Sequence, residues 1–212
     1  MLRSPINALV QVFDGNGIEF LGKIQTINKQ KVTVLLTEAV TANVESPLKI
    51  HLGQGISRGE KMDFVIQKAV ELGVDQITPL FTERCGVKLN DDRWQKRLQH
   101  WRAVAISACE QCGRNKVSEI NEPQSLTDWV QSVSAELKLI CDVETDAKLK
   151  NTTDKINSIS LLIGPEGGFD PREIKLAEQN KFISLSLGPR VLRTETAAIA
   201  AITLMQSKFG DI

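Results

Sequence analysis

Two glycine-bearing segments in the last quarter of the chain carry the residue types best suited to bind a ligand. Residues 163–168 read Ile-Gly-Pro-Glu-Gly-Gly, and residues 187–197 read Leu-Gly-Pro-Arg-Val-Leu-Arg-Thr-Glu-Thr-Ala. Each follows a short apolar run typical of a strand and leads into a helical pattern. Open α/β sheets bind ligands at the carboxyl ends of their parallel strands, and glycine lets the main chain approach a ligand closely. The two segments therefore predict one shared ligand crevice.

Other glycine-loop sites fit these segments poorly. The first segment lacks the Lys-Ser/Thr pair of a phosphate-binding loop and the Gly-x-Gly-x-x-Gly spacing of a dinucleotide turn. One such turn alone is equally typical of a tight strand-to-helix connection without a ligand, whereas two turns favour a ligand site. Arg190 and Arg193 in the second segment have guanidinium groups able to stabilise charge on a reacting oxygen or to grip a phosphate. Glu195 also suits the dipole at a helix start, which needs no catalytic role.

Composition narrows the class of protein. No apolar stretch reaches the length of a membrane span, and the first residues lack the apolar core of a secretory signal. Four cysteines in 212 residues indicate a reducing, cytoplasmic setting rather than a disulfide framework. Cys109 and Cys112 match no standard zinc spacing, so we expect no metal. There is no Gly-x-Ser-x-Gly elbow to support a hydrolase.

Charge is balanced overall but uneven along the chain. The formal net charge is zero, which argues against a strongly basic nucleic-acid coat. Between residues 83 and 116, however, eight basic residues face four acidic ones: Arg84, Lys88, Arg93, Lys96, Arg97, Arg102, Arg114 and Lys116 against Glu83, Asp91, Asp92 and Glu110. This cluster is typical either of a phosphate-binding surface or of a solvated helix face with ordinary ion pairs.

The pattern of elements predicts an α/β fold. Residues 9–39 read as a few strands with a turn at 14–17, and a polar segment at 41–47 follows as a linker. Beyond it strands and helices alternate, which predicts a mostly parallel sheet with helices on both faces. We expect strands at 48–52, 76–81, 137–141, 158–163 and 182–187, and helices at 59–72, 91–112, 125–133, from 170 and at 195–209.

Six segments together resemble one family. They are the two glycine segments, residues 108–115 (Ala-Cys-Glu-Gln-Cys-Gly-Arg-Asn), 57–63 (Ser-Arg-Gly-Glu-Lys-Met-Asp), 67–73 (Gln-Lys-Ala-Val-Glu-Leu-Gly) and 82–85 (Thr-Glu-Arg-Cys). The chain resembles the bacterial small-subunit (16S) rRNA uridine-N3 methyltransferases, within the SPOUT or α/β-knot superfamily. The match spans nearly the whole chain.

The resemblance implies a fold, a cofactor and partners. It implies a small PUA-like, RNA-binding β domain over residues 1–46, which looks truncated against the family pattern. A SPOUT methyltransferase domain with a C-terminal trefoil knot then covers residues 47–212. It also implies a cytoplasmic homodimer that acts on small-subunit rRNA or the 30S subunit. The implied cofactor is S-adenosyl-L-methionine, with contacts from Leu162, Gly164, Glu166, Gly167, Leu187, Gly188, Val191, Leu192 and Thr196.

The resemblance also suggests roles in catalysis. Arg193 is the residue expected nearest the reacting base, where its guanidinium stabilises negative charge on a uracil oxygen. Glu195 or a water is the candidate base. The basic cluster then supplies phosphate contacts, from Arg84, Lys88, Arg97, Arg102 and Arg114. Two alternatives stay open: a ribose 2′-O-methyltransferase of the same superfamily, and a truncated RNA-binding protein without catalysis.

Overall fold

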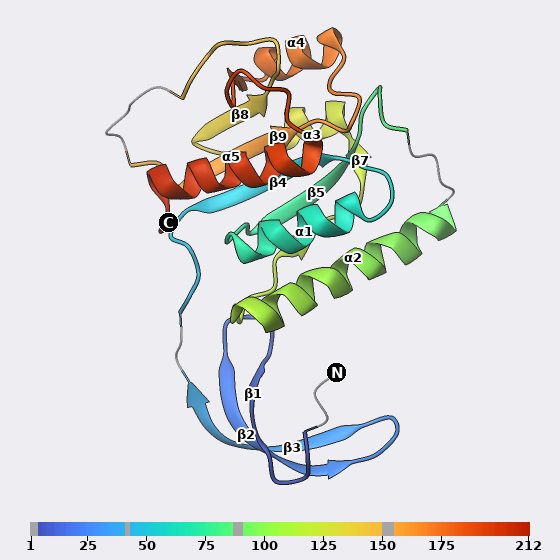
Figure 1. Cartoon of the computed structure of the whole chain (residues 1–212), viewed down its shortest axis with the longest axis vertical. Helices are drawn as coiled ribbons and strands as arrows, with labels where there is room; N and C mark the ends of the chain where they lie inside the picture. Colours follow the sequence, from blue (N-terminus) through green and yellow to red (C-terminus); the bar gives the residue numbers. More distant parts are fainter. Residues whose placement is uncertain (1–3, 41–42, 87–90, 150–154) are drawn as a thin grey trace. The chain divides into compact units, whose positions relative to one another are not determined.

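Two compact units make up the chain in the computed structural model, which describes residues 4–40, 43–86, 91–149 and 155–212 (Figure 1). Unit 1 comprises Met1–Glu45 and Cys109–Val117, and unit 2 comprises Ser46–Ala108 and Ser118–Ile212. Residues 109–117, which the expected boundary assigns to the second domain, therefore group with the first unit. No helix within the described residues combines the length and the apolar character needed to cross a membrane.

Unit 1 is built on an antiparallel sheet of three strands in the order β1-β2-β3. The strands are β1 (Leu9–Phe13), β2 (Glu19–Ile27) and β3 (Val32–Val40). The predicted turn between β1 and β2 is present, because the Asp14 carboxylate accepts hydrogen bonds from the backbone N–H groups of Asn16 and Ile18 at 2.7 and 3.1 Å. Short polar side chains commonly stabilise turns in this way.

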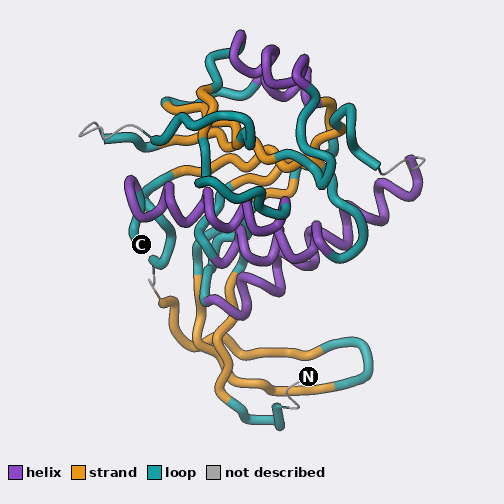
Figure 2. The backbone as a smooth tube through the Cα atoms, turned by 45° about the horizontal axis from the view of Figure 1, so that its top comes forward, coloured by secondary structure: helices purple, strands orange, loops and turns teal. Residues whose placement is uncertain are grey.

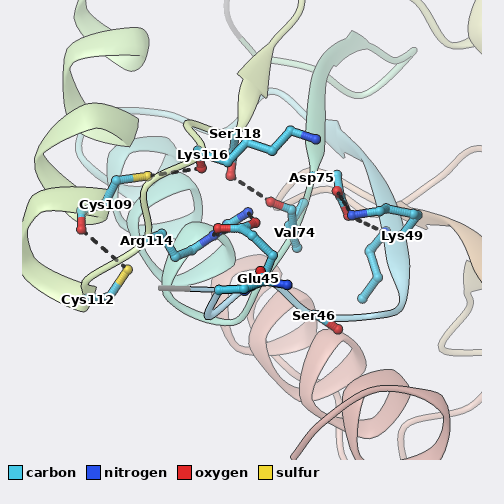
Figure 3. Close-up of polar contacts among 12 residues, drawn as sticks. Glu45, Ser46, Lys49, Val74, Asp75, Cys109, Cys112, Arg114, Lys116 and Ser118 are labelled. Carbon is cyan, nitrogen blue, oxygen red and sulfur yellow. Dashed lines mark hydrogen bonds and ion pairs between the residues drawn. The ribbon is translucent and has the colours of Figure 1, made fainter. Parts of the chain in front are cut away.

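A buried ion pair lies in the part of unit 1 that follows its sheet. Arg114 is 4% exposed, and its guanidinium binds the Glu45 carboxylate, with 2.6 Å between Nη2 and Oε2 (Figure 3). Nearby, the Cys109 thiol donates to the carbonyl oxygen of Lys116 at 3.7 Å. Arginine suits a buried pair because its planar fork matches a carboxylate.

Unit 2 is built on a sheet whose recorded strand pairings are all parallel, in the order β10-β8-β9-β4-β5-β6, with β7 also beside β5. Its strands are β4 (Lys49–Gly55), β5 (Gln76–Phe81), β6 (Glu119–Ile120), β7 (Gln124–Ser125), β8 (Leu137–Cys141), β9 (Ser158–Ile163) and β10 (Ile183–Leu185). The predicted mostly parallel α/β sheet is confirmed. β4 lies in the middle, between β9 and β5.

Helices cover both faces of this sheet (Figures 1 and 2). They are α1 (Lys61–Glu71), α2 (Asp91–Cys112), α3 (Leu126–Ser132), α4 (Pro171–Gln179) and α5 (Thr194–Phe209). α1 and α5 lie side by side on one face, and α3 and α4 contact each other on the other. Trp129 of α3 and Phe182 belong to the core of the second face. The predicted helix starts at Ser125 and Asp170 are confirmed by side-chain caps, the latter a full capping box.

The ends of several elements differ from the sequence prediction, which also lacked β6 and β7, and two of these differences bear on the site. β4 continues to Gly55, three residues beyond the predicted end at 52, and α5 begins at Thr194, one residue before the predicted start. Gly53 and Gly55 pair with β5, and Gln54 pairs with Ile163 of β9. Two neighbouring strands therefore hold β4 extended where its local sequence, Gly-Gln-Gly, favours a turn.

Candidate functional site

The first glycine segment contacts the residue at which the second segment enters α5. The Thr194 hydroxyl donates a hydrogen bond to the carbonyl oxygen of Gly164, with 2.6 Å between the oxygens. Gln54, at the carboxyl end of β4, donates from Nε2 to Thr194 Oγ1 and to the carbonyl oxygen of Gly55, both at 3.0 Å. The two segments thus meet beside the carboxyl ends of β4 and β9. The sequence predicted a crevice at the ends of the strands before the two segments, β9 and β10, which β8 separates in the sheet.

The approach of the first segment to β4 depends on a glycine. A β-carbon at Gly55 would lie 2.5 Å from the backbone nitrogen of Pro165 and 2.9 Å from the carbonyl carbon of Gly164. Real β-carbons essentially never approach backbone so closely. Main chain therefore packs directly against main chain at this end of the sheet.

A carboxylate fastens the first segment to the start of α1. Glu166 accepts a hydrogen bond from the backbone N–H of Arg58 at 3.1 Å, and its Oε1 lies 3.2 Å from Lys61 Nζ. Partial burial raises the pKa of the Glu166 carboxyl, but backbone hydrogen bonds and the Lys61 charge outweigh this effect and lower it below its usual value. Glu166 is therefore ionised, and its carboxylate binds the Arg58 backbone and the Lys61 ammonium group.

Two further residues tie the first segment to the loop after β5. Arg84 Nη1 donates to the carbonyl oxygen of Gly167 at 3.1 Å. The Glu173 carboxylate of α4 accepts from the backbone N–H groups of Glu83 and Asp170, both at 2.8 Å. The segment is thus held by the loops after β4 and β5 as well as by α5.

The second segment is more open than the first. Gly188 has φ of +106°, a conformation that side chains rarely adopt, which explains the glycine there. Val191 is 83% exposed, Leu187 and Leu192 are half-buried, and Thr196 is exposed. Arg193 stands directly before α5 with an exposed side chain that makes no capping bond.

Two of the predicted site residues are partly or wholly internal. The Leu162 side chain is fully buried in the core beneath α3 and α4, so any ligand contact from it uses the main chain. Glu195 is half-buried, and its Oε2 is buried without a hydrogen-bond partner among the described residues. Gln54 Oε1 is in the same situation. Unpaired buried acceptors are uncommon and call for an explanation.

The basic residues expected to bind RNA divide into different environments. Arg84 and Arg102 are exposed, and Arg102 Nε donates to the carbonyl oxygen of Ile120 at 3.3 Å. Arg97 is half-buried, with its guanidinium 5.8 Å from the centre of the Trp101 ring. Lys88 lies outside the described residues.

Arg114 corrects the expectation of a uniform basic surface. Its guanidinium is buried against Glu45 instead of facing solvent (Figure 3). An arginine whose guanidinium is buried in an internal ion pair is poorly placed to contact a phosphate. Removing one partner of such a pair leaves the other charge buried without a partner. The residue type was read correctly as cationic, but nothing in the local sequence pointed to a carboxylate 69 residues away.

Three residues of this site escaped the sequence analysis: Gln54, Thr194 and Glu173. Gln54 lies between two glycines beyond the predicted end of its strand, so it read as a loop residue. Thr194 lies in the second segment, but the sequence prediction gives it no role. The capping box identified Glu173 only as a local helix signal, whereas its carboxylate also binds Glu83. Among the described residues, no group of three or more side chains is arranged to hold a metal ion.

Curated relatives match nearly the whole chain. The ribosomal RNA small subunit methyltransferase E of Buchnera aphidicola subsp. Schizaphis graminum is 43% identical over 213 residues, covering 100% of this chain and 87% of the relative. That of Bacillus subtilis is 30% identical over 197 residues, covering 89% and 77%.

Two solved structures resemble this chain over nearly its whole length. A Legionella pneumophila protein in complex with the cofactor S-adenosylmethionine superposes with a TM-score of 0.96 at 43% identity, covering 99% of this chain and 87% of that one. The ribosomal RNA small subunit methyltransferase E of Neisseria gonorrhoeae, bound to S-adenosylmethionine, gives 0.92 at 38% identity with the same coverage. The family model for the RNA methyltransferase domain matches residues 44–206. The chain therefore belongs to the RNA methyltransferase family whose curated members are the ribosomal RNA small subunit methyltransferases E.

Proposed function

We propose that this protein transfers a methyl group from S-adenosylmethionine to the N3 atom of a uridine in small-subunit ribosomal RNA. Membership of the family and the S-adenosylmethionine bound to the Neisseria relative support the cofactor and the ribosomal substrate. The observation in this chain that carries the proposal is the contact between Thr194 and Gly164, because it unites the two glycine segments in one site.

The residues at this end of the sheet fit the cofactor. S-adenosylmethionine carries a positive sulfonium, an ammonium group and an adenine amino group, all of which suit hydrogen-bond or charge acceptors. Glu195 Oε2 is a buried acceptor without a partner among the described residues. The residues we propose to hold the cofactor are Leu162, Gly164, Glu166, Gly167, Leu187, Gly188, Val191, Leu192 and Thr196, with Glu166 acting through the fold of its segment.

The protein's part in the reaction is to position the uracil and manage its charge. The cofactor supplies a methyl group activated on a positively charged sulfur. Uridine N3 carries a proton that must leave, and the resulting negative charge spreads onto the neighbouring carbonyl oxygens. Arg193 stabilises this charge with its exposed guanidinium at the start of α5. Glu195, the next residue but one, or a water accepts the proton.

Substrate binding draws on both units. We assign Arg84, Arg97 and Arg102 to phosphate contacts, with Lys88 from the segment outside the described residues, and leave out the buried Arg114. Unit 1 is proposed as the PUA-like RNA-binding domain, and the segments after β9 and β10 as the trefoil knot. A cytoplasmic homodimer is the proposed working state.

Methylation of undermodified 30S subunits tests the proposal. With isotopically labelled S-adenosylmethionine, we expect label in rRNA and, by mass analysis of the nucleosides, N3-methyluridine. Arg193→Ala is expected to lower turnover at least about tenfold while cofactor binding stays normal. Arg190→Ala, three residues earlier in the same exposed segment, is measured beside it to show which of the two arginines carries the role.

Each other outcome contradicts a defined part of the proposal. A label on ribose would identify a 2′-O-methyltransferase. Cofactor binding without any transfer would indicate an RNA-binding protein without catalysis. A loss of less than tenfold in Arg193→Ala would remove the role assigned to this arginine.

A further inference from the structure

A glutamine that no motif singled out lies between the two glycine segments. Gln54 is 0% exposed and is the penultimate residue of β4, directly before Gly55. Successive strand residues point to opposite faces of a sheet. His51 meets Trp129 of α3 on one face, whereas Gln54 points to the other face and reaches Thr194 of α5. Its carboxamide is therefore enclosed between the sheet and the start of that helix.

The amide of Gln54 begins a chain of hydrogen bonds that links three pieces of backbone. Nε2 donates to the carbonyl oxygen of Gly55 and to the Thr194 hydroxyl, and that hydroxyl donates in turn to the carbonyl oxygen of Gly164. Gln54 Nε2 also lies 3.5 Å from the Gly164 carbonyl oxygen. These hydrogen bonds fix β4, the first glycine segment and the end of the second glycine segment relative to one another.

A double donor suits this arrangement. The carbonyl groups of Gly55 and Gly164 are both acceptors, and two acceptors repel each other unless a donor stands between them. The amide NH₂ of glutamine supplies two hydrogens, and a threonine hydroxyl both accepts and donates. Burial makes the loss of any of these bonds costly, because water has no access to replace it.

We infer that Gln54 and Thr194 are positioning residues that set the spacing of the two glycine segments around the methyl donor. This inference rests on the proposed donor site between those segments. The two residues act through the backbone of Gly55, Gly164 and Arg193, and preorganise a site whose own contacts come from the segments. Their loss is expected to weaken donor binding more than it weakens the fold.

A second buried glutamine provides a matched control. Gln206, near the other end of α5, is also 0% exposed; its Oε1 accepts from Ser46 Oγ and its Nε2 donates to the carbonyl oxygen of Leu72, both at 2.8 Å. It joins α5 to the end of α1 and to the segment before β4. Gln54→Met and Gln206→Met therefore remove comparable buried amides, one that contacts the start of α5 and one within its last turns.

The experiment compares donor binding and stability in four variants of the full chain. Calorimetry measures the Kd for S-adenosylmethionine, and thermal unfolding measures Tm. We expect Gln54→Met and Thr194→Val to raise Kd at least about tenfold, the effect of one lost buried hydrogen bond. Thr194→Ser keeps the hydroxyl and stays within about threefold of the natural chain, while Gln206→Met lowers Tm but changes Kd less than about twofold.

The outcomes separate the inference from the proposed site. If Gln54→Met and Thr194→Val bind the donor as the natural chain does, the positioning role is wrong. If Gln206→Met weakens binding as much as Gln54→Met, the effect is general destabilisation and the inference is also wrong. Should Gln54→Met fail to fold, the comparison of Thr194→Val with Thr194→Ser decides the question. Gly188→Val tests the site itself: unchanged donor affinity there would place the donor elsewhere.

Discussion

The two ends of the parallel sheet in unit 2 differ in what packs against a glycine there. At the carboxyl end, Gly55 faces backbone, since a β-carbon there would meet Pro165 and Gly164 main-chain atoms. At the amino end, Gly73 faces side chains: a β-carbon there would meet Gln206 Nε2 at 2.8 Å and the Ser46 β-carbon at 3.3 Å. Gly55 thus allows main chain to pack against main chain, whereas Gly73 leaves room for the side chains of Gln206 and Ser46.

The same contrast separates the two buried glutamines. Both amide atoms of Gln206 have partners, which completes a polar network with Ser46 and Leu72. Gln54 uses its Nε2 fully, but its Oε1 has no partner among the described residues. Most buried polar groups in folded proteins have hydrogen-bond partners, so an unpaired acceptor beside a candidate site is consistent with a ligand partner. This difference fits our proposal that the methyl donor binds at the carboxyl end of the sheet.

The largest expected effect comes from filling the glycine at each end. Gly55→Ala is predicted to lower donor affinity by about a hundredfold or more, because the first segment has to move away from β4. Gly73→Ala is its counterpart: φ of +80° and the Gln206 contact make it destabilising, while donor affinity stays near that of the natural chain. Calorimetry with S-adenosylmethionine measures both. If Gly55→Ala and Gly73→Ala lost donor affinity equally, the two ends of the sheet would not differ in their role in donor binding.

A smaller effect is expected from the side chain that ties the first segment to the loop after β5. Arg84→Ala removes the donor to the Gly167 carbonyl, and we expect Kd for the methyl donor to rise about threefold to tenfold. Arg102→Ala, which has no contact with the segment among the recorded hydrogen bonds, is expected to alter only RNA affinity and its salt dependence. Donor titrations and filter binding at several salt concentrations distinguish the two. An Arg84 variant with normal donor affinity would assign that residue to RNA alone.

The smallest effect on donor affinity is expected at His51, in the amino half of β4. Burial lowers the pKa of its imidazole to about 4, and Nε2 lies 2.7 Å from Thr78 Oγ1 and 3.3 Å from Trp129 Nε1. The unfolded chain, with a pKa near 6.5, takes up the proton first as pH falls. The stability due to neutral His51 is therefore present above pH 6.5 and is lost between about 6.5 and 4, in total on the order of 3 kcal/mol.

Chemical denaturation of the natural chain and of His51→Gln tests this assignment. The difference in free energy of unfolding between them is expected to shift in favour of the variant as pH falls from 7 to 4.5, while donor affinity at pH 7 stays similar. A difference independent of pH would show that the histidine does not remain neutral in the folded chain.

Much of unit 2 was predictable because its signals are local. Alternating apolar runs and helical faces predicted the parallel sheet, and Ser125 and Asp170 marked helix starts that the caps confirm. The glycine segments marked the ends of β9 and β10 through residue type alone. By contrast, the pairing of Arg114 with Glu45 and the extension of β4 to Gly55 depend on partners far away in the sequence. No local pattern contains that information.

The amino-acid sequence alone indicated where the glycine-bearing turns occur, since glycine, proline and capping residues restrict the backbone at their own positions. Its six motif segments also showed the resemblance to a methyltransferase family. Only the tertiary structure decided which polar groups meet: that Gln54 donates to Thr194, that Thr194 donates to Gly164, and that Arg114 is buried. The physical reason is that backbone conformation responds to neighbours along the chain, whereas burial and hydrogen-bond partnership are set by segments that fold together from a distance.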